Sequence, residues 1–119
     1  MKYTTDNLIV NLTFEFSKLI ILYTSELELN RKYAFSNQLF RSATSIGANV
    51  REAQNAESKA DFIHKMKIAA KESEETIYWL ELAPFVHQHS LLVELSQRII
   101  SIQRILNKII GSSKTALQK

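Results

Sequence analysis

Residues 41–53, RSATSIGANVREA, and residues 58–65, SKADFIHK, decide the fold of this chain. In the first stretch, apolar residues recur every three or four positions, and small and polar residues follow a separate face. In the second, Ser58 precedes Asp61 in the manner of a helix cap followed by an acidic first turn. Two amphipathic helices joined by a short polar connection indicate a helical bundle that has a second face available for packing.

Composition limits the chain to one mostly helical domain. It has 119 residues, with only two glycines, one proline and no cysteine. So few turn-forming residues leave little room for irregular structure, and the absence of cysteine excludes disulfides and thiolate metal sites. No run of apolar residues approaches the ~18 that a membrane-spanning helix requires. We therefore expect a cytoplasmic protein that does not interact with a membrane.

The apolar periodicity continues outward from these stretches and predicts four helices. Their expected bounds are residues 6–27, 34–56, 59–86 and 91–110. Asp6 caps the first helix, Pro84 disfavours helix just before it, and Gly111 is a typical stop for the fourth. Residues 112–119 are predicted to be a polar, flexible tail. Long helices with short connections favour an all-α, antiparallel, up-down-up-down four-helix bundle over residues 1–111.

Apolar and small residues also occupy faces that a lone bundle would leave in water. Val10, Phe14 and Ile21 cluster on the first helix, and Trp79 lies on an outward arc of the third. Aligned outward apolar residues favour contact between copies of the chain in a homo-oligomer. The alternative is that the 28–33 connection or the tail covers Trp79. The expected subunit-interface residues are Arg41, Ser45, Ala48, Asn49, Glu52, Ile68, Glu75, Trp79 and Val86.

Residue patterns that support catalysis or metal binding are missing from the sequence. Asp61 and His64 have the spacing of two helical metal ligands, but the pair occurs once, so we expect a solvated His64. His87 and His89 flank a predicted helix end and are interpreted as connection residues. The glutamates of residues 72–75 point in different directions around their helix. We therefore expect no enzyme activity, no cofactor and no metal.

The positive charge is unevenly distributed. The formal net charge is +3 and the sequence pI is about 9.2, yet no acidic residue follows Glu94. Exposed cations suffice for contacts to nucleic-acid phosphates, although a solvated basic face is the simpler interpretation. The candidate nucleic-acid-binding residues lie on the third and fourth helices: Lys59, Lys65, Lys67, Lys71, Arg98, Arg104 and Lys108.

Three segments carry a resemblance to a known family: QLFRSATSIGANVREA (38–53), ESKADFIHKMKIAAKES (57–73) and ETIYWLELA (75–83). With these segments the chain resembles the small four-helix-bundle proteins encoded within intervening sequences of bacterial 23S rRNA genes, long labelled ribosomal proteins. The resemblance implies a homo-oligomer in the form of a five-membered ring. Pro84 and the connection at 87–90 depart from the family pattern.

The chain is more distantly similar to the accessory protein of diversity-generating retroelements, which works with a reverse transcriptase and binds nucleic acid. Together with the charge distribution, these likenesses favour a non-enzymatic, homo-oligomeric scaffold. Its expected partners are RNA or an RNA-processing or reverse-transcribing protein. One alternative is a protein–protein adaptor without affinity for nucleic acid, and another is a nuclease active only as an assembly.

Overall fold

The structure is a computed structural model that describes residues 7–118, and these residues form four helices and no strand. The helices are α1 (Leu8–Leu29), α2 (Tyr33–Ala53), α3 (Lys59–Val86) and α4 (Leu91–Gln118). The prediction of an all-α chain with four helices is confirmed.

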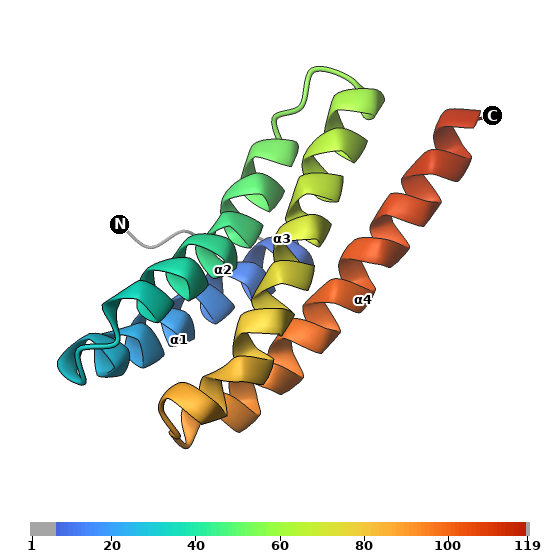
Figure 1. Cartoon of the computed structure of the whole chain (residues 1–119). Helices are drawn as coiled ribbons and strands as arrows, with labels where there is room; N and C mark the ends of the chain where they lie inside the picture. The colour runs from blue at the N-terminus through green and yellow to red at the C-terminus, as the bar shows by residue number, and fades with distance from the viewer. Residues whose placement is uncertain (1–6, 119) are drawn as a thin grey trace.

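Each helix packs against the helices that precede and follow it in the chain, and the first and last helices also pack against each other. α1 packs on α2, α2 on α3, α3 on α4, and α4 on α1. Figure 1 shows the chain doubling back at each of its three connections, residues 30–32, 54–58 and 87–90. The contact between α1 and α4 is the least extensive of the four.

The core is a seam of large apolar side chains that all four helices contribute. Phe16 and Tyr23 from α1, Leu39 from α2, Met66 from α3 and Leu95 from α4 are fully buried. Burial of a side chain of this size contributes about 1.5–3 kcal/mol to folding. Most of the apolar residues that recur every three or four positions in α2 and α4 are buried.

The start of α1 differs from the prediction. Val10, expected on the outward face, is only 2% exposed, whereas the preceding Leu8 is 61% exposed. Phe14 and Ile21, also expected outward, are 38% and 47% exposed. Apolar residues surround α1 on most sides, so its own periodicity does not specify which face turns inward. The buried residues of this helix are Ile9, Val10, Thr13, Phe16, Ile20, Tyr23, Thr24 and Leu27.

By length and composition, α1 is also the one described helix that could cross a membrane. Eight of its side chains are buried in the structure. The packing of α1 in the bundle therefore accounts for its apolar composition, as it does for the core helices of many proteins. The expectation that the protein avoids membranes stays a prediction.

Tyr23 joins α1 to the connection between α3 and α4. Its phenol donates a hydrogen bond to the backbone carbonyl of His87, with an O···O distance of 2.7 Å, and its ring meets the ring of His89 edge-on. Burial raises the pKa of Tyr23 to about 12, so the phenol keeps the proton that it donates. This bond holds the last connection against the core.

The helix ends differ from the prediction by a few residues. Asn7, rather than Asp6, caps α1 by accepting from the backbone N–H of Val10; Asp6 lies outside the described residues. α1 extends to Leu29 and α2 stops at Ala53, three residues before the predicted end. α3 has the predicted bounds. It contains Pro84 in its last turn, where the missing N–H of proline disrupts few of the helix hydrogen bonds.

The largest correction concerns the end of α4. Gly111 was expected to end this helix, but it has no positive φ, and α4 continues to Gln118. Ile110 is 8% exposed and Ser113 is 7% exposed, so the helix is still packed on the bundle at and beyond the glycine. Packing therefore overrides the weak local preference of glycine to stop a helix, and most of the predicted tail is helical.

Replacing Gly111 with alanine should stabilise the protein. A methyl group at this position would meet no atom within 4 Å, so only the helix preference changes. We expect Gly111→Ala to raise the free energy of unfolding by about 0.5–1 kcal/mol, measured by urea denaturation. The control is Gly47→Ala, whose methyl would come within 3.4 Å of Thr13, so a smaller gain is expected. A destabilised Gly111→Ala variant would show that α4 does not continue through this residue.

Candidate functional site

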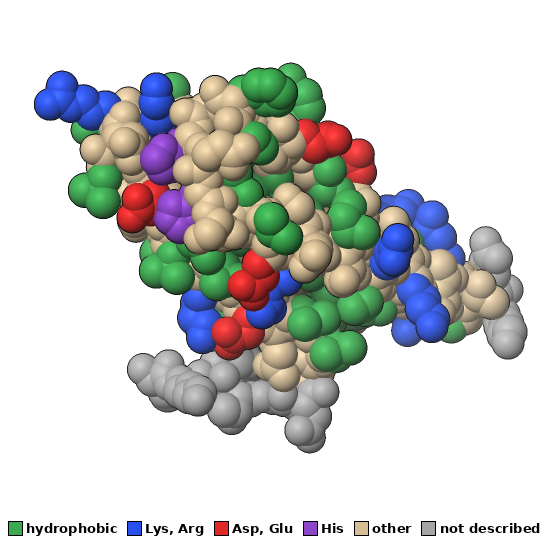
Figure 2. Space-filling view, turned by 90° about the horizontal axis from the view of Figure 1, so that it is seen from below, with side chains coloured by type: hydrophobic (Ala, Val, Ile, Leu, Met, Phe, Trp, Pro, Cys, Tyr) green, Lys and Arg blue, Asp and Glu red, His purple; other side chains and the backbone are tan. Residues whose placement is uncertain are grey.

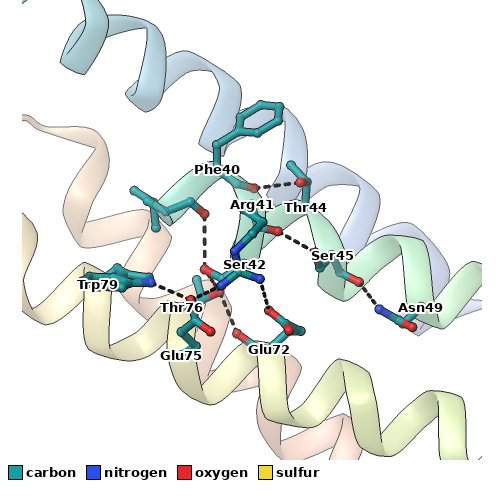
Figure 3. Close-up of polar contacts among 11 residues, drawn as sticks. Phe40, Arg41, Ser42, Thr44, Ser45, Asn49, Glu72, Glu75, Thr76 and Trp79 are labelled. Carbon is teal, nitrogen blue, oxygen red and sulfur yellow. Dashed lines mark hydrogen bonds and ion pairs between the residues drawn. The ribbon is translucent and has the colours of Figure 1, made fainter. Parts of the chain in front are cut away.

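A polar cluster lies across the contact between α2 and α3 (Figure 3). The Arg41 guanidinium on α2 meets two carboxylates on α3: Nη1 lies 3.3 Å from an oxygen of Glu72, and Nη2 contacts Glu75. The indole N–H of Trp79 donates to the same Glu75 carboxylate, with an N···O distance of 3.0 Å. The glutamates of residues 72–75 were expected to point in different directions, but Glu72 and Glu75 both face Arg41. They share one helical face with Trp79, since these residues are three and four positions apart.

Beneath this cluster, small buried residues bring the two helices close together. The hydroxyl oxygens of Thr76 on α3 and Ser42 on α2 are 3.0 Å apart, and both residues are fully buried. Thr76 also bonds to the carbonyl of Glu72, and Ser73 to that of Ala70, within their own helix. Hydroxyls whose partners are satisfied in this way can be buried without a large penalty.

The charged groups of the cluster have opposite signs, and each favours the ionised form of the other. The hydrogen bond from Trp79 and then the hydrogen bond and charge of Arg41 hold the pKa of Glu75 below its ordinary value. The hydrogen bond with Glu75, and then the negative charges of Glu75 and Glu72, raise the pKa of Arg41. Both groups are therefore charged at neutral pH, and the pair is satisfied within one chain. Arg41 remains about half-exposed, so water screens this attraction.

Trp79 lies in a different environment from the one predicted. Its ring is half-buried against the core and meets Phe35 edge-on at 5.9 Å and Tyr78 at 5.1 Å. It was expected on an outward face, and the alternative was that the 28–33 connection or the tail covers it; its aromatic neighbours are Phe35 and Tyr78. Ile68 and Val86 are also half-buried. The role of these residues in a subunit interface stays a prediction.

The remaining predicted interface residues lie on α2, and most of them form hydrogen bonds or an ion pair within the chain. The Ser45 hydroxyl donates to its own helix, and the Asn49 amide donates to the carbonyl of Ser45. Glu52 forms an ion pair with Lys65 of α3 at 3.1 Å. Ala48 is exposed. The structure thus brings Arg41, Glu75 and Trp79 together and places Ala48 and Asn49 farther along α2.

An outer groove between α1 and α2 was not predicted. It encloses about 190 Å³, and an alanine methyl at Gly47 would lie 3.4 Å from Thr13, which shows how closely the two helices approach. At its rim, the ring of Phe14 is 38% exposed and lies beneath the cations of Lys18 and Arg51. The signal in the sequence was the run of small residues in ATSIGA. The groove is lined by Val10, Thr13, Phe14, Ser17, Thr44, Gly47, Ala48 and Arg51.

Two of the predicted nucleic-acid-binding residues are already paired with acids. Lys65 contacts Glu52 at 3.1 Å, and Arg98 contacts Glu94 on the preceding turn of α4 at 2.8 Å. Lys71 is exposed, and its positive charge contributes to the lowered pKa of Glu75 in the polar cluster. These three cations are therefore less available to an external anion.

The other basic residues gather toward the end of α4, as the blue side chains in Figure 2 show. Lys59, Lys67, Arg104 and Lys108 are exposed, and within residues 7–118 none of them forms an ion pair. Lys114, which was not among the predicted binding residues, lies beside Lys67, and close polar contact and like charge lower its pKa. Two cations held together without an acid form a surface that attracts anions.

No metal centre is present among residues 7–118, where no three His, Cys, Asp or Glu side chains come together. His64 is exposed, as expected. The rings of His87 and His89 are 6.3 Å apart, and Nδ1 of His89 accepts from the backbone N–H of Leu91. His89 thereby acts as a cap at the beginning of α4.

The polar cluster should respond to acid at an unusually low pH. Because the pKa of Glu75 is lowered in the folded protein, the stability linked to its carboxylate is present at neutral pH and is lost as the pH falls through that pKa. Trp79 is the only tryptophan, so its fluorescence reports this step. We expect a transition below the ordinary pKa of glutamate, absent in Glu75→Gln. Glu81→Gln is the matched control, and a transition that persists in Glu75→Gln would contradict the assignment.

Comparison with known proteins agrees with this architecture. A crystal structure of a protein of unknown function from the S23 ribosomal protein family of Bacteroides thetaiotaomicron is similar to the chain, with a TM-score of 0.81 and 38% identity. The likeness covers 87% of this chain and 98% of that one. No protein of curated function matches significantly. The match to the model of the 23S rRNA-intervening sequence protein family covers residues 5–108, so the resemblance is confirmed and the chain belongs to this family.

Proposed function

We propose that the protein is a non-enzymatic, homo-oligomeric scaffold that binds RNA or an RNA-processing or reverse-transcribing protein in the cytoplasm. In this proposal each subunit is an antiparallel, up-down-up-down bundle, and the subunits form a five-membered ring. The observation that carries the RNA part is the group of cations without acidic partners on the second half of α4.

The arrangement of charge supports an anionic partner. Elsewhere in residues 7–118, Arg41, Lys65 and Arg98 are neutralised by carboxylates. Within residues 7–118, Arg104 and Lys108 form no ion pair, and α4 itself contains no acid after Glu94. A cation of this kind displaces counterions when it neutralises a phosphate, and this release is the main driving force of non-specific binding to nucleic acid.

The outer face of α1 and α2 supports assembly. Phe14, Ile21 and Phe40 are between 38% and 47% exposed. The small Ala48 lies in the groove beside Phe14 and allows a partner helix to approach. Covering these side chains with a second copy removes apolar surface from water. In a closed ring, each basic patch is repeated, so several weak phosphate contacts act together.

RNA binding should depend steeply on salt and on the cations of α4. We expect a double variant, Arg104→Gln with Lys108→Gln, to weaken RNA binding. It should also reduce the slope of log K against log salt by about 0.7 for each single-strand phosphate that is no longer neutralised. Fluorescence anisotropy with a labelled RNA between about 50 and 200 mM salt measures both quantities. The matched control is Arg31→Gln with Lys32→Gln, which removes the same charge from two exposed residues in the connection between α1 and α2.

The alternatives give different results in the same experiment. An adaptor for proteins would show no salt-dependent affinity for RNA. A nuclease would shorten the labelled RNA in the presence of a divalent metal. An equal decrease of affinity in the α4 variant and its control would indicate that net charge alone, rather than α4, attracts RNA.

Assembly should depend on the outer groove. We expect Ala48→Glu to lower the mass measured by light scattering toward that of one subunit, because the new carboxylate would be buried beside Phe14 in an interface. Ala116→Glu introduces the same group at an exposed position of α4 and should leave the mass unchanged. An unchanged mass in Ala48→Glu, or a wild-type protein that is a monomer, would contradict the assignment of this face.

A further inference from the structure

The first turns of α3 carry basic and apolar side chains on one arc, in which Ile63 is buried at 7% exposure. At about 100° per residue, Phe62, Lys59, Ile63, Lys67 and Ala60 succeed one another over roughly 160° of the helix surface. Hollows in the surface lie on both sides of this arc, toward α2 and toward α4. An extended ligand could therefore cross the start of α3 from one hollow to the other.

On one side, α3 and the end of α4 form a groove of about 370 Å³. Its apolar residues are Ala60 and Ile63 from α3 and Leu117 from α4, which is 54% exposed. Its cations are Lys67 and Lys114, one from each helix. The groove exists because α4 continues beyond Gly111, so it could not be expected from a helix that ends there.

The ammonium groups of the two lysines in this groove lie close enough to repel each other. Lys67 lowers the pKa of Lys114 through close polar contact and like charge. Neither ammonium group forms an ion pair within residues 7–118. The helix dipole favours a lysine near the end of α4, but it does not explain why a second lysine lies beside it. An anion placed between the two ammonium groups would relieve their repulsion.

On the other side, a hollow of about 290 Å³ lies between the beginning of α3 and the end of α2. Lys59 and Phe62 line it, and the Lys59 ammonium lies 5.7 Å from the centre of the Phe62 ring. Phe62 is half-buried, so part of its ring remains accessible. An aromatic ring beside a lysine matches the common arrangement in which a base stacks and its phosphate is neutralised.

We propose that a single-stranded segment of RNA crosses the start of α3, with a phosphate between Lys67 and Lys114 and a base against Phe62. This inference rests on the proposed function and specifies the RNA surface within it. Single-stranded RNA is favoured over a duplex because only unpaired bases can reach an aromatic ring and the apolar floor of a groove. A duplex would use the cations alone.

The test compares a labelled twelve-nucleotide oligouridylate with a twelve-base-pair RNA duplex on the full chain. We expect Lys67→Gln with Lys114→Gln to weaken oligouridylate binding about tenfold and to reduce the salt slope by about 0.7 for each phosphate that is no longer neutralised. We expect Phe62→Leu, which keeps an apolar side chain, to weaken oligouridylate binding about fivefold and to leave duplex binding unchanged. The control is Arg31→Gln with Lys32→Gln, two exposed residues in the connection between α1 and α2, and circular dichroism melting verifies that each variant is folded.

Each result has a definite meaning. Selective weakening in the Lys67/Lys114 and Phe62 variants supports the proposal. RNA binding by the wild type with equal weakening in the lysine variant and its control overturns this site, while the proposed RNA function stands. Duplex binding equal to that of oligouridylate, with no effect of Phe62→Leu, overturns the single-strand assignment. Failure of the wild type to bind either RNA overturns the proposed function together with this inference.

Discussion

α2 and α3 approach one another closely because the residues between them are small and their hydroxyl groups are satisfied. Ser42 and Thr76 are fully buried 3.0 Å apart, and the hydrogen bonds to their own helices leave no polar atom unpaired. Larger side chains at these positions would separate the helices and open the core. The charged pair of Arg41 and Glu75 and the ring of Trp79 then close the outer edge of this contact. The position of α3, and through it that of α4, depends on this arrangement.

This contact also determines which surfaces are left for partners. Residues that looked available in the sequence, such as Glu75 and Trp79, have intramolecular partners across α2 and α3. The outer face of α1 and α2 keeps exposed aromatic rings, and the end of α4 keeps unpaired cations. The exposed aromatic rings of α1 and α2 and the unpaired cations at the end of α4 are therefore on different parts of the molecule. Such a separation suits a scaffold that associates with copies of itself through one face and with an anionic partner through another.

The helices and most of their buried positions follow from sequence periodicity, and the polar cluster was partly foreseeable. The spacing of Glu72, Glu75 and Trp79 places them on one face, but periodicity within α3 cannot reveal that Arg41 lies opposite them. The groove beside Gly47 was missed because close approach depends on how two helices dock. Lys114 was missed for a related reason, since it was assigned to a tail and has meaning only beside Lys67.

The sequence by itself determined that this protein is an all-α chain of four helices and a member of the 23S rRNA-intervening sequence protein family, because periodicity, caps and motifs are local properties. Only the tertiary structure decided which residues at the start of α1 turn inward and where α4 ends. α1 is apolar on most sides, so the packing of the surrounding helices buries Val10 and leaves Leu8 exposed. Gly111 is a weak signal that costs about 1 kcal/mol within a helix, and the packing of Ile110 and Ser113 carries the helix through it.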